Sequence, residues 1–211
     1  MKKLVYLVLL VLLCGMLSGC GGEDLLAEAP NPIATIHLTN GKSMRFELFL
    51  QDAPNTVANF VELAKDGFYD GLSFFRVVPG ALVQAGSPND SLIGGAGHTI
   101  QGEFSENGIA NSIAHTRGTI SMSRQSGFDT ASSQFFIMQG SYPEYNGHYA
   151  AFGRAVDAGS LAVLDEIASV AVDGRHSPVG TLYRIRTIEV ETGGYEYESA
   201  KIFPDEEEKK D

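Results

Sequence analysis

Two short apolar segments carry polar side chains that could do chemistry. Residues 74–84 (Phe-Phe-Arg-Val-Val-Pro-Gly-Ala-Leu-Val-Gln) place Arg76 and Gln84 among apolar neighbours, and residues 133–137 (Ser-Gln-Phe-Phe-Ile) do the same with Gln134. Burying a guanidinium or an amide in such surroundings is costly unless another group hydrogen-bonds to it. A single arginine of this kind usually points from a half-buried strand to solvent. Two such segments together instead predict a pocket with an apolar wall and hydrogen-bonding groups.

The sequence lacks the residues that a metal site or a serine nucleophile would need. The histidines have no metal-ligand spacing, so we predict no metal site; they are His37, His98, His115, His148 and His176. The chain has no G-x-S-x-G nucleophile motif. Its formal net charge of -11 argues against nucleic acid and against electrostatic docking on anionic lipid, and we interpret it as a means of staying soluble.

Residues 1–19 are predicted to be a lipoprotein signal peptide. Lys2 and Lys3 form a positive start, residues 4–13 are apolar, and Leu17-Ser18-Gly19-Cys20 is a small-residue cleavage site ending in cysteine. That tetrapeptide resembles the bacterial lipobox, whose cysteine becomes the lipidated N-terminus of the mature protein. The apolar run is too short to favour a membrane-spanning helix. We therefore expect an extracytoplasmic protein that a lipid on Cys20 holds at a membrane.

Three segments follow the signal. Residues 20–32 are rich in glycine, acidic residues and proline, which is typical of a flexible tether. Residues 33–192 form the predicted domain, and residues 193–211 form an acidic extension for which no function is predicted. Because Cys14 leaves with the signal and Cys20 carries lipid, no cysteine pair remains for a disulfide. The domain must therefore depend on a hydrophobic core, which its length can supply.

The domain is predicted to consist mostly of short strands. Residues 33–38 alternate between apolar and polar, Asn40-Gly41 is a strong hairpin signal, and strand character resumes over residues 44–50. Helices are expected over residues 53–66, where Pro54 suits the first turn, and over residues 160–168. Many strands with two helices indicate an antiparallel barrel.

Residues 74–84 and 133–137 resemble the two signature segments of the cyclophilin-type peptidyl-prolyl isomerases. Gly102-Glu103-Phe104, residues 115–124 and residues 151–154 match further parts of that pattern in the same order. The resemblance runs from about Ile33 to about Val190. It implies a mainly β fold, a closed eight-stranded antiparallel β-barrel capped by two α-helices. It also implies a monomer that acts on proline-containing polypeptides.

The activity implied by the resemblance is rotation about an X-Pro peptide bond, which faces a barrier of about 18–20 kcal/mol because amide resonance must be broken. No bond is made or cut, so no metal or cofactor is needed. The catalyst needs an apolar pocket, anchors for the flanking backbone and a donor that favours the twisted amide. We expect Arg76 to be that donor and Gln84 to position it. Phe136 and Leu82 are expected to hold the proline ring.

The resemblance implies further substrate-binding residues: Phe74, Ala81, Met122, Ser123, Arg124, Gln134, Tyr145 and Tyr149. Ser123 and Arg124 are expected to present backbone to the bound peptide. Ala81 stands where the family usually has a pocket phenylalanine, and Tyr145, in place of a pocket leucine, could refill some of that volume. Tyr149 replaces a common histidine. Glu144 lies where some members carry the tryptophan that favours cyclosporin.

Two functions remain open at this point. One is a lipid-anchored isomerase that assists the folding of exported proteins at the cell envelope. The other is a module of the same fold that binds proline-containing segments with weak turnover, which the pocket changes at Ala81 and Tyr145 favour. Acceleration of proline isomerisation in a peptide distinguishes the two.

Overall fold

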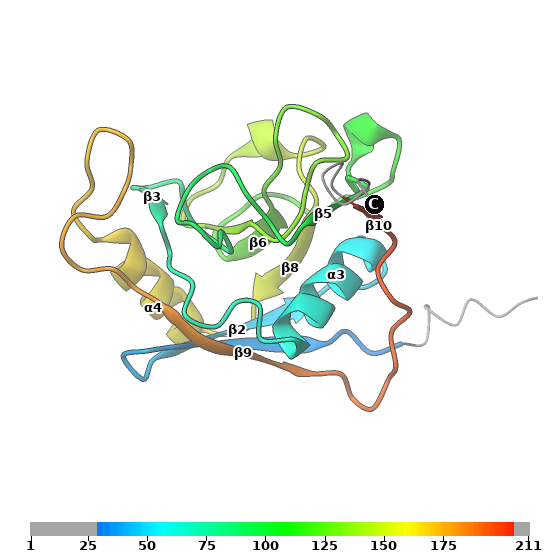
Figure 1. The fold of residues 1–211 in the computed structure, drawn as a ribbon, viewed down its shortest axis with the longest axis horizontal. Coiled ribbons are helices and arrows are strands. Elements are labelled where there is room, and N and C mark those ends of the chain that lie inside the picture. Colours follow the sequence, from blue (N-terminus) through cyan, green and yellow to red (C-terminus); the bar gives the residue numbers. More distant parts are fainter. Residues whose placement is uncertain (1–28, 205–211) are drawn as a thin grey trace, which may run out of the picture.

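The computed structural model describes residues 29–204 (Figure 1). Its strands are β1 (Ile33–Leu38), β2 (Ser43–Leu48), β3 (Arg76–Val78), β4 (Leu82–Ala85), β5 (His98–Ile100), β6 (Thr119–Met122), β7 (Phe135–Met138), β8 (Ala151–Ala155), β9 (Ile185–Glu191) and β10 (Ile202–Pro204). Its helices are α3 (Pro54–Lys65) and α4 (Ala158–Ala168), with short 3-10 helices η1 (Ser105–Asn107) and η2 (Pro143–Tyr145). The predicted signal peptide and Cys20 lie outside the described residues.

The first two strands form the predicted hairpin. In β1 every second side chain is buried, and β2 follows the same alternation. Gly41 has a φ of +85°, a conformation that favours glycine, and its N–H donates to the carbonyl of Leu38. The turn therefore sets the register in which Ile36 lies opposite Met44, and both side chains enter the core.

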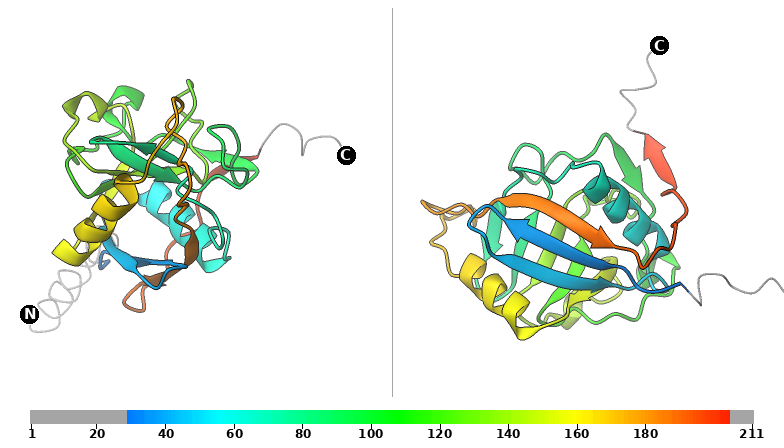
Figure 2. Two further views of the ribbon diagram at one scale, coloured as in Figure 1. Left: turned by 90° about the vertical axis from the view of Figure 1, so that its left-hand side faces the viewer. Right: turned by 90° about the horizontal axis from the view of Figure 1, so that it is seen from below.

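Eight strands form one curled antiparallel sheet in the order β3-β4-β7-β6-β8-β2-β1-β9. The predicted mainly β fold with eight antiparallel strands and two helices is confirmed. The edges of the sheet, β3 and β9, approach each other just before both strands begin, at an isolated bridge between Ser73 and Arg184. Around that bridge, the N–H groups of Gly71 and Phe74 donate to the carbonyls of Ile185 and Tyr183, so the two edges meet over a few residues without a continuous ladder. Figure 2 shows the curl of the sheet.

The two helices lie at opposite ends of the curled sheet (Figures 1 and 2). In α3, Val57, Phe60, Val61 and Ala64 form the buried stripe, and Gly67 follows the helix with a φ of +70°. The helix α4 begins two residues earlier than predicted because the side chain of Asp157 accepts a hydrogen bond from the N–H of Ser160, as an N-cap does. Within residues 29–204, no helix is long and apolar enough to cross a membrane.

The core lies inside the curl and is rich in aromatic rings. Phe135 of β7 packs edge-on against Phe60 of α3 at 5.5 Å between ring centroids and against Tyr69 at 5.6 Å. Phe152 of β8 contacts Phe60 at 5.2 Å. Such ring pairs add stability beyond the area that they bury. They join helix α3 to the inner face of the sheet.

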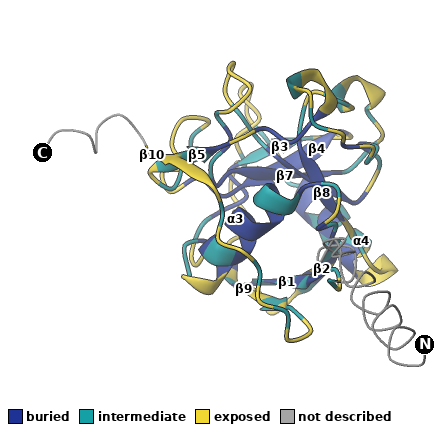
Figure 3. Ribbon diagram, turned by 90° about the vertical axis from the view of Figure 1, so that its right-hand side faces the viewer, coloured by how far each residue is buried: buried dark blue, intermediate teal, exposed yellow. Residues whose placement is uncertain are grey.

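Residues 192–204 extend along α3 and end in β10, which pairs with β5 (Figure 3). Asn55 of α3 makes two hydrogen bonds with the backbone of Lys201, of 2.7 and 3.1 Å. Seven residues further along the helix, the carboxylate of Glu62 accepts from the N–H of Ala200. The tyrosine ring of Tyr197 donates its hydroxyl hydrogen to the carbonyl of Pro30. The extension thus crosses α3 and meets the start of the described chain.

Candidate active site

Strand register places four side chains in one row on the outer face of the sheet. Arg76 of β3 lies opposite Gln84 of β4, and Gln84 lies opposite Phe136 of β7. Phe136 in turn lies opposite Ser121 of β6. Directly opposed residues in antiparallel strands share a face, so the three side chains predicted to be catalytic stand side by side.

A chain of hydrogen bonds runs along this row. The Arg76 guanidinium donates from Nη1 to Oε1 of Gln84 at 3.0 Å. The amide nitrogen of Gln84 donates to Oγ of Ser123 at 3.1 Å and to Oε1 of Gln134 at 2.9 Å. The Gln84 side chain is buried and uses both its acceptor and its donors, so its orientation is determined.

The guanidinium keeps donors for a ligand. In the described part of the chain, Arg76 makes one side-chain hydrogen bond, to Gln84, and arginine has five N–H donors. The side chain is partly exposed beside the apolar cluster described next. Arg76 can therefore donate to a group placed above the row without giving up its contact with Gln84.

An apolar cluster adjoins the row. It consists of Ala81, Leu82, Phe136 and Met138, with Val78, Tyr142, Tyr145 and Tyr149 packed against it. The ring of Tyr145 lies 5.9 Å from Phe136 and that of Tyr149 lies 5.5 Å from it, both edge-on. Tyr145 thus packs against the cluster that contains Ala81. The tyrosines leave only 3% of Phe136 exposed.

His115 packs against the apolar cluster. Its ring stacks on Phe136 with centroids 6.0 Å apart, and it is buried. Nδ1 lies 3.1 Å from the side-chain oxygen of Asn146, which only accepts, so Nδ1 carries the hydrogen. Nε2 then accepts from the hydroxyl of Ser121 at 3.0 Å. Burial lowers the pKa of His115 below its usual value of about 6.5, although the hydrogen bond to Asn146 opposes this.

The neutral state of His115 predicts a pH dependence of stability. A histidine with a lowered pKa binds fewer protons when folded than when unfolded, so its contribution is complete above pH about 6.5 and is lost as the pH falls below that value. We expect the free energy of unfolding to decrease there by up to about 1.4 kcal/mol per pH unit from this group. Denaturant unfolding between pH 7.5 and 5 measures this slope.

The variant His115→Gln should show a shallower slope, because glutamine cannot take up the proton. Equal slopes in wild type and His115→Gln would contradict the assignment of a neutral buried imidazole.

Arg124 supports the site through its side chain. Its guanidinium lies over the rings of Phe104 and Tyr149, both at 5.1 Å from the ring centroid. It also donates to the carbonyls of His148 and Gln125, at 2.9 and 3.0 Å. These contacts occupy the side chain of Arg124 and leave its backbone as the part that could contact a peptide.

Two predicted substrate-binding side chains lie elsewhere. Met122 is paired with Phe135, so it shares the inner face of the sheet and is buried in the core. Phe74 precedes β3, where strand alternation no longer holds, and its ring packs against Phe135 in the core at 6.5 Å. Neither side chain reaches the outer face of the sheet on which Arg76 and Gln84 lie.

Several residues near the row were not predicted. Val78, Tyr142 and Met138 belong to the apolar cluster, and His115 supports it. A sequence signal existed for Val78 and Met138, because each lies two residues from Arg76 or Phe136 and so shares the same strand face. Tyr142 and His115 reach the cluster from loops, for which spacing in the sequence offers no such rule.

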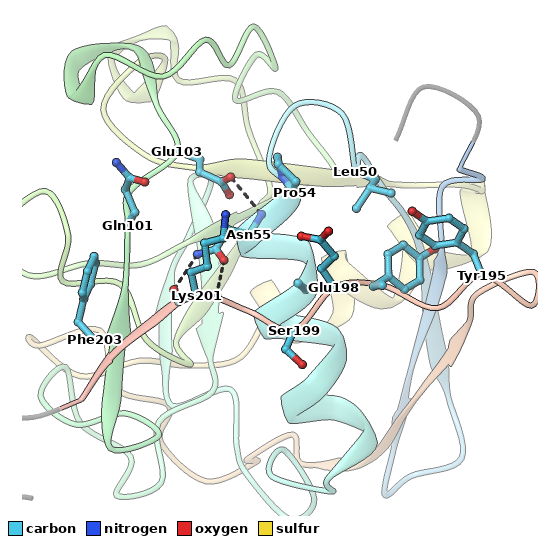
Figure 4. A pocket seen from close by; sticks show the side chains of 12 residues that line it. Leu50, Pro54, Asn55, Gln101, Glu103, Tyr195, Glu198, Ser199, Lys201 and Phe203 are labelled. Atoms are coloured by element: carbon cyan, nitrogen blue, oxygen red, sulfur yellow. Dashed lines mark hydrogen bonds between the residues drawn. The ribbon is translucent and has the colours of Figure 1, made fainter. Parts of the chain in front are cut away.

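A separate cavity of about 390 Å³ lies between α3 and the C-terminal extension (Figure 4). Its lining includes Leu50, Tyr195, Tyr197, Asn55, Glu103 and Lys201. Glu103 accepts from the N–H groups of Asn55 and Thr56 and so caps the start of α3. No lining residue of this cavity belongs to the row or to the apolar cluster. Within residues 29–204, no group of three or more His, Cys, Asp or Glu side chains could hold a metal ion.

Comparison with known proteins identifies the family. The model of the family described as cyclophilin type peptidyl-prolyl cis-trans isomerase matches residues 33–190. A peptidyl-prolyl cis-trans isomerase of Helicobacter pylori is 44% identical over 139 residues, which are 66% of this chain and 82% of that protein. Peptidyl-prolyl cis-trans isomerase B of Bacillus subtilis is 40% identical over 141 residues, 65% of this chain and 95% of that protein.

Solved structures agree with the sequence comparisons. The crystal structure of a cyclophilin type peptidyl-prolyl cis-trans isomerase of Cryptosporidium parvum superposes with a TM-score of 0.68 and 27% identity. The match covers 76% of this chain and 98% of that chain. A second structure of that protein, in the presence of the dipeptide Ala-Pro, has a TM-score of 0.66. The fold, the order of the motifs and these relatives together show that the chain belongs to the cyclophilin-type peptidyl-prolyl cis-trans isomerases and has their isomerase activity.

Proposed function

We propose that this isomerase is a lipoprotein that speeds the folding of exported proteins at the cell envelope. The observation that carries the proposal is the sequence of residues 1–20, in which two lysines, an apolar run and Leu17-Ser18-Gly19-Cys20 precede the isomerase domain. Uncatalysed proline isomerisation takes tens of seconds or longer, so a catalyst is useful where exported chains fold. The acidic composition is consistent with anchoring by lipid rather than by basic residues.

The row Arg76–Gln84–Phe136 supports a mechanism in which no covalent bond changes. A proline ring would rest against the edge of Phe136 and Leu82, while the preceding carbonyl swings about the C–N bond. The amide nitrogen regains a lone pair as it twists, and Arg76 donates to it. Gln84 holds the guanidinium in place at 3.0 Å. Because the hydrogen bond forms with the twisted amide and not with the planar one, it lowers the barrier rather than merely tightening binding.

Ser123 and Gln134 would complete the substrate site. Both hydrogen-bond to the Gln84 amide, and the N–H of Ser123 donates to the carbonyl of Gln134. The segment around Ser123 thus offers backbone beside the row, where the peptide on either side of the proline would lie. The Ala-Pro dipeptide named with the Cryptosporidium parvum protein supports a proline-containing peptide as the ligand of this site.

The variant Cys20→Ser should abolish lipid attachment, because the serine hydroxyl cannot replace the thiol as the acceptor. The protein should then remain uncleaved or be released from the membrane, and its isomerase domain should keep full activity. Labelling of cells with a radioactive or clickable fatty acid, followed by membrane fractionation, measures this. Cys14→Ser is the matched control and should still carry the label. Label on Cys20→Ser equal to that of the wild type would contradict the lipoprotein assignment.

A further inference from the structure

The cavity between α3 and the C-terminal extension shares no residue with the isomerase row, and it is built partly by chain outside the family match (Figure 4). The match ends at residue 190, whereas Tyr195, Tyr197 and Phe203 belong to the lining. The cavity volume of about 390 Å³ lies at the lower end of the range of roughly 300–1,000 Å³ that is typical of ligand pockets. It is therefore large enough for one or two apolar side chains, and it is a feature of this chain's own extension.

Apolar side chains make up much of the lining. Leu50 is 2% exposed and Ala58, on α3, is 6% exposed. The rings of Tyr195 and Tyr197 pack edge-on with their centroids 4.9 Å apart. Both oxygens of the Glu103 carboxylate accept from N–H groups at the start of α3, so this charge already has partners. An apolar side chain suits such a cavity better than an ion does, because burying unpaired charge is costly and burying apolar surface is favourable.

The described chain begins beside this cavity. The hydroxyl of Tyr197 donates to the carbonyl of Pro30 at 3.1 Å, and the N–H of Leu50 donates to the side-chain oxygen of Asn31 at 3.2 Å. Ala29, just before them, packs against the main core cluster. Two residues of the lining thus hold the first described residues, so the segment that precedes Ala29 joins the domain next to the cavity.

The predicted tether contains one pair of large apolar side chains, Leu25 and Leu26, among glycines and acidic residues. Leu26 lies three residues before Ala29, and three extended residues span at most about 11 Å, so its side chain is within reach of the cavity. Residues 205–211, which follow β10, contain no apolar residue. Of the two segments that directly flank the described chain, the tether is therefore the one whose side chains suit the lining.

We propose that Leu25 and Leu26 dock into the cavity between α3 and residues 195–203, so that part of the tether is bound to the domain. Because the segment belongs to the same chain, its effective concentration is in the millimolar range, and a weak contact is enough to occupy the cavity. Docking itself needs no lipid. Its consequence for the anchor rests on the proposed lipid at Cys20: the free span shortens from residues 21–28 to residues 21–24, or from roughly 16 Å to roughly 11 Å root-mean-square. The α3 side of the domain then stays nearest the membrane.

The first test measures thermal unfolding of the full-length chain in mild detergent. Leu25→Ser/Leu26→Ser should lower the melting temperature by about 2–4 °C, because two docked leucines return to water. The matched control Glu23→Ser/Asp24→Ser changes the neighbouring pair in the same tether and should leave the melting temperature unchanged. Ala58→Leu fills the cavity, and in that background the leucine substitutions should have no effect. Equal melting temperatures of the leucine variant and the wild type, or a shift that persists in Ala58→Leu, would overturn the docking.

A second measurement does not depend on the folding of the cavity variant. A photoreactive benzophenone amino acid replaces Leu26 in the full-length chain, and mass spectrometry after irradiation locates the cross-linked residues. We expect intramolecular products with residues 50–58 or 195–203, whereas the same group at Gly22 should give few of them. Products mainly with a second copy of the chain, with detergent or with other parts of the domain would overturn the proposal. Fatty-acid labelling of Cys20 is read separately, so the loss of the lipid and the loss of docking are distinguishable.

Discussion

Replacement of Arg76 by alanine is expected to lower the isomerisation rate by roughly ten- to a hundredfold. A charge-assisted hydrogen bond is worth about 1.5–3 kcal/mol, and each 1.36 kcal/mol of barrier is a factor of ten. The loss should appear in kcat, because the bond to the amide nitrogen forms as the amide twists. Arg76 is held by Gln84 at 3.0 Å, so the wild-type donor is already in position. Peptide kinetics by NMR exchange measure the change.

The folded state should tolerate this substitution. Arg76 is partly exposed and contributes nothing to the buried core cluster, so the melting temperature should shift by only a few degrees. Arg76→Lys should also be slow, because a point-charge ammonium lacks the planar fork that bridges Gln84 and a ligand. The exposed Arg154, changed to alanine, is the control for a general loss of charge. An unchanged kcat in Arg76→Ala would show that another group solvates the twisted amide.

Truncation of Phe136 is expected to reduce activity more than stability. In the proposed mechanism the ring is the apolar floor beside Arg76, and without it the proline would have no surface to press against while the carbonyl rotates. We expect a loss of kcat/KM of about tenfold or more. The cost in stability should be about 3 kcal/mol, at the lower end for such a truncation, because the half-buried Tyr145 and Tyr149 can move into the space.

Phe135, the next residue on the same strand, is the internal control. It points to the opposite face, is completely buried and packs edge-on against Phe60, Tyr69 and Phe74. Phe135→Ala should therefore cost about 3–5 kcal/mol of stability. Its activity per folded molecule should stay close to that of the wild type. Thermal melts and peptide kinetics on both variants test the pair; exchanged behaviour would mean that the outer and inner faces of β7 are assigned the wrong way round.

The polar side chains of the row could be located from the sequence because they lie on strands. A polar residue in an otherwise apolar strand must either face solvent or find a partner. Arg76 and Gln84, eight residues apart, lie opposite each other on two strands joined by a tight turn, and their side chains form a hydrogen bond. The hairpin at Asn40-Gly41 was predictable for a similar local reason, since only a few residue types suit the positive φ of that turn.

Other features of the structure depend on information that the sequence pattern lacks. The face of Met122 is set by its pairing with Phe135, from a strand thirteen residues further along the chain, and not by its own neighbours. Phe74 lies just outside β3, where alternation ends. The course of residues 192–204 along α3 depends on side-chain to backbone hydrogen bonds of Asn55 and Glu62, which leave no periodic signal. Contacts with distant residues decide the face of Met122 and the course of residues 192–204, whereas the end of a strand decides the position of Phe74.

One measurement tests the central claim most directly, namely the rate of cis-trans exchange of an Ala-Pro peptide in the presence of the purified protein. At micromolar protein, the account predicts exchange far faster than the uncatalysed process, which takes tens of seconds or longer. Most of that acceleration should disappear with Arg76→Ala while the circular dichroism spectrum stays the same. An exchange rate equal to that of the free peptide, with the wild-type protein folded, would contradict the account.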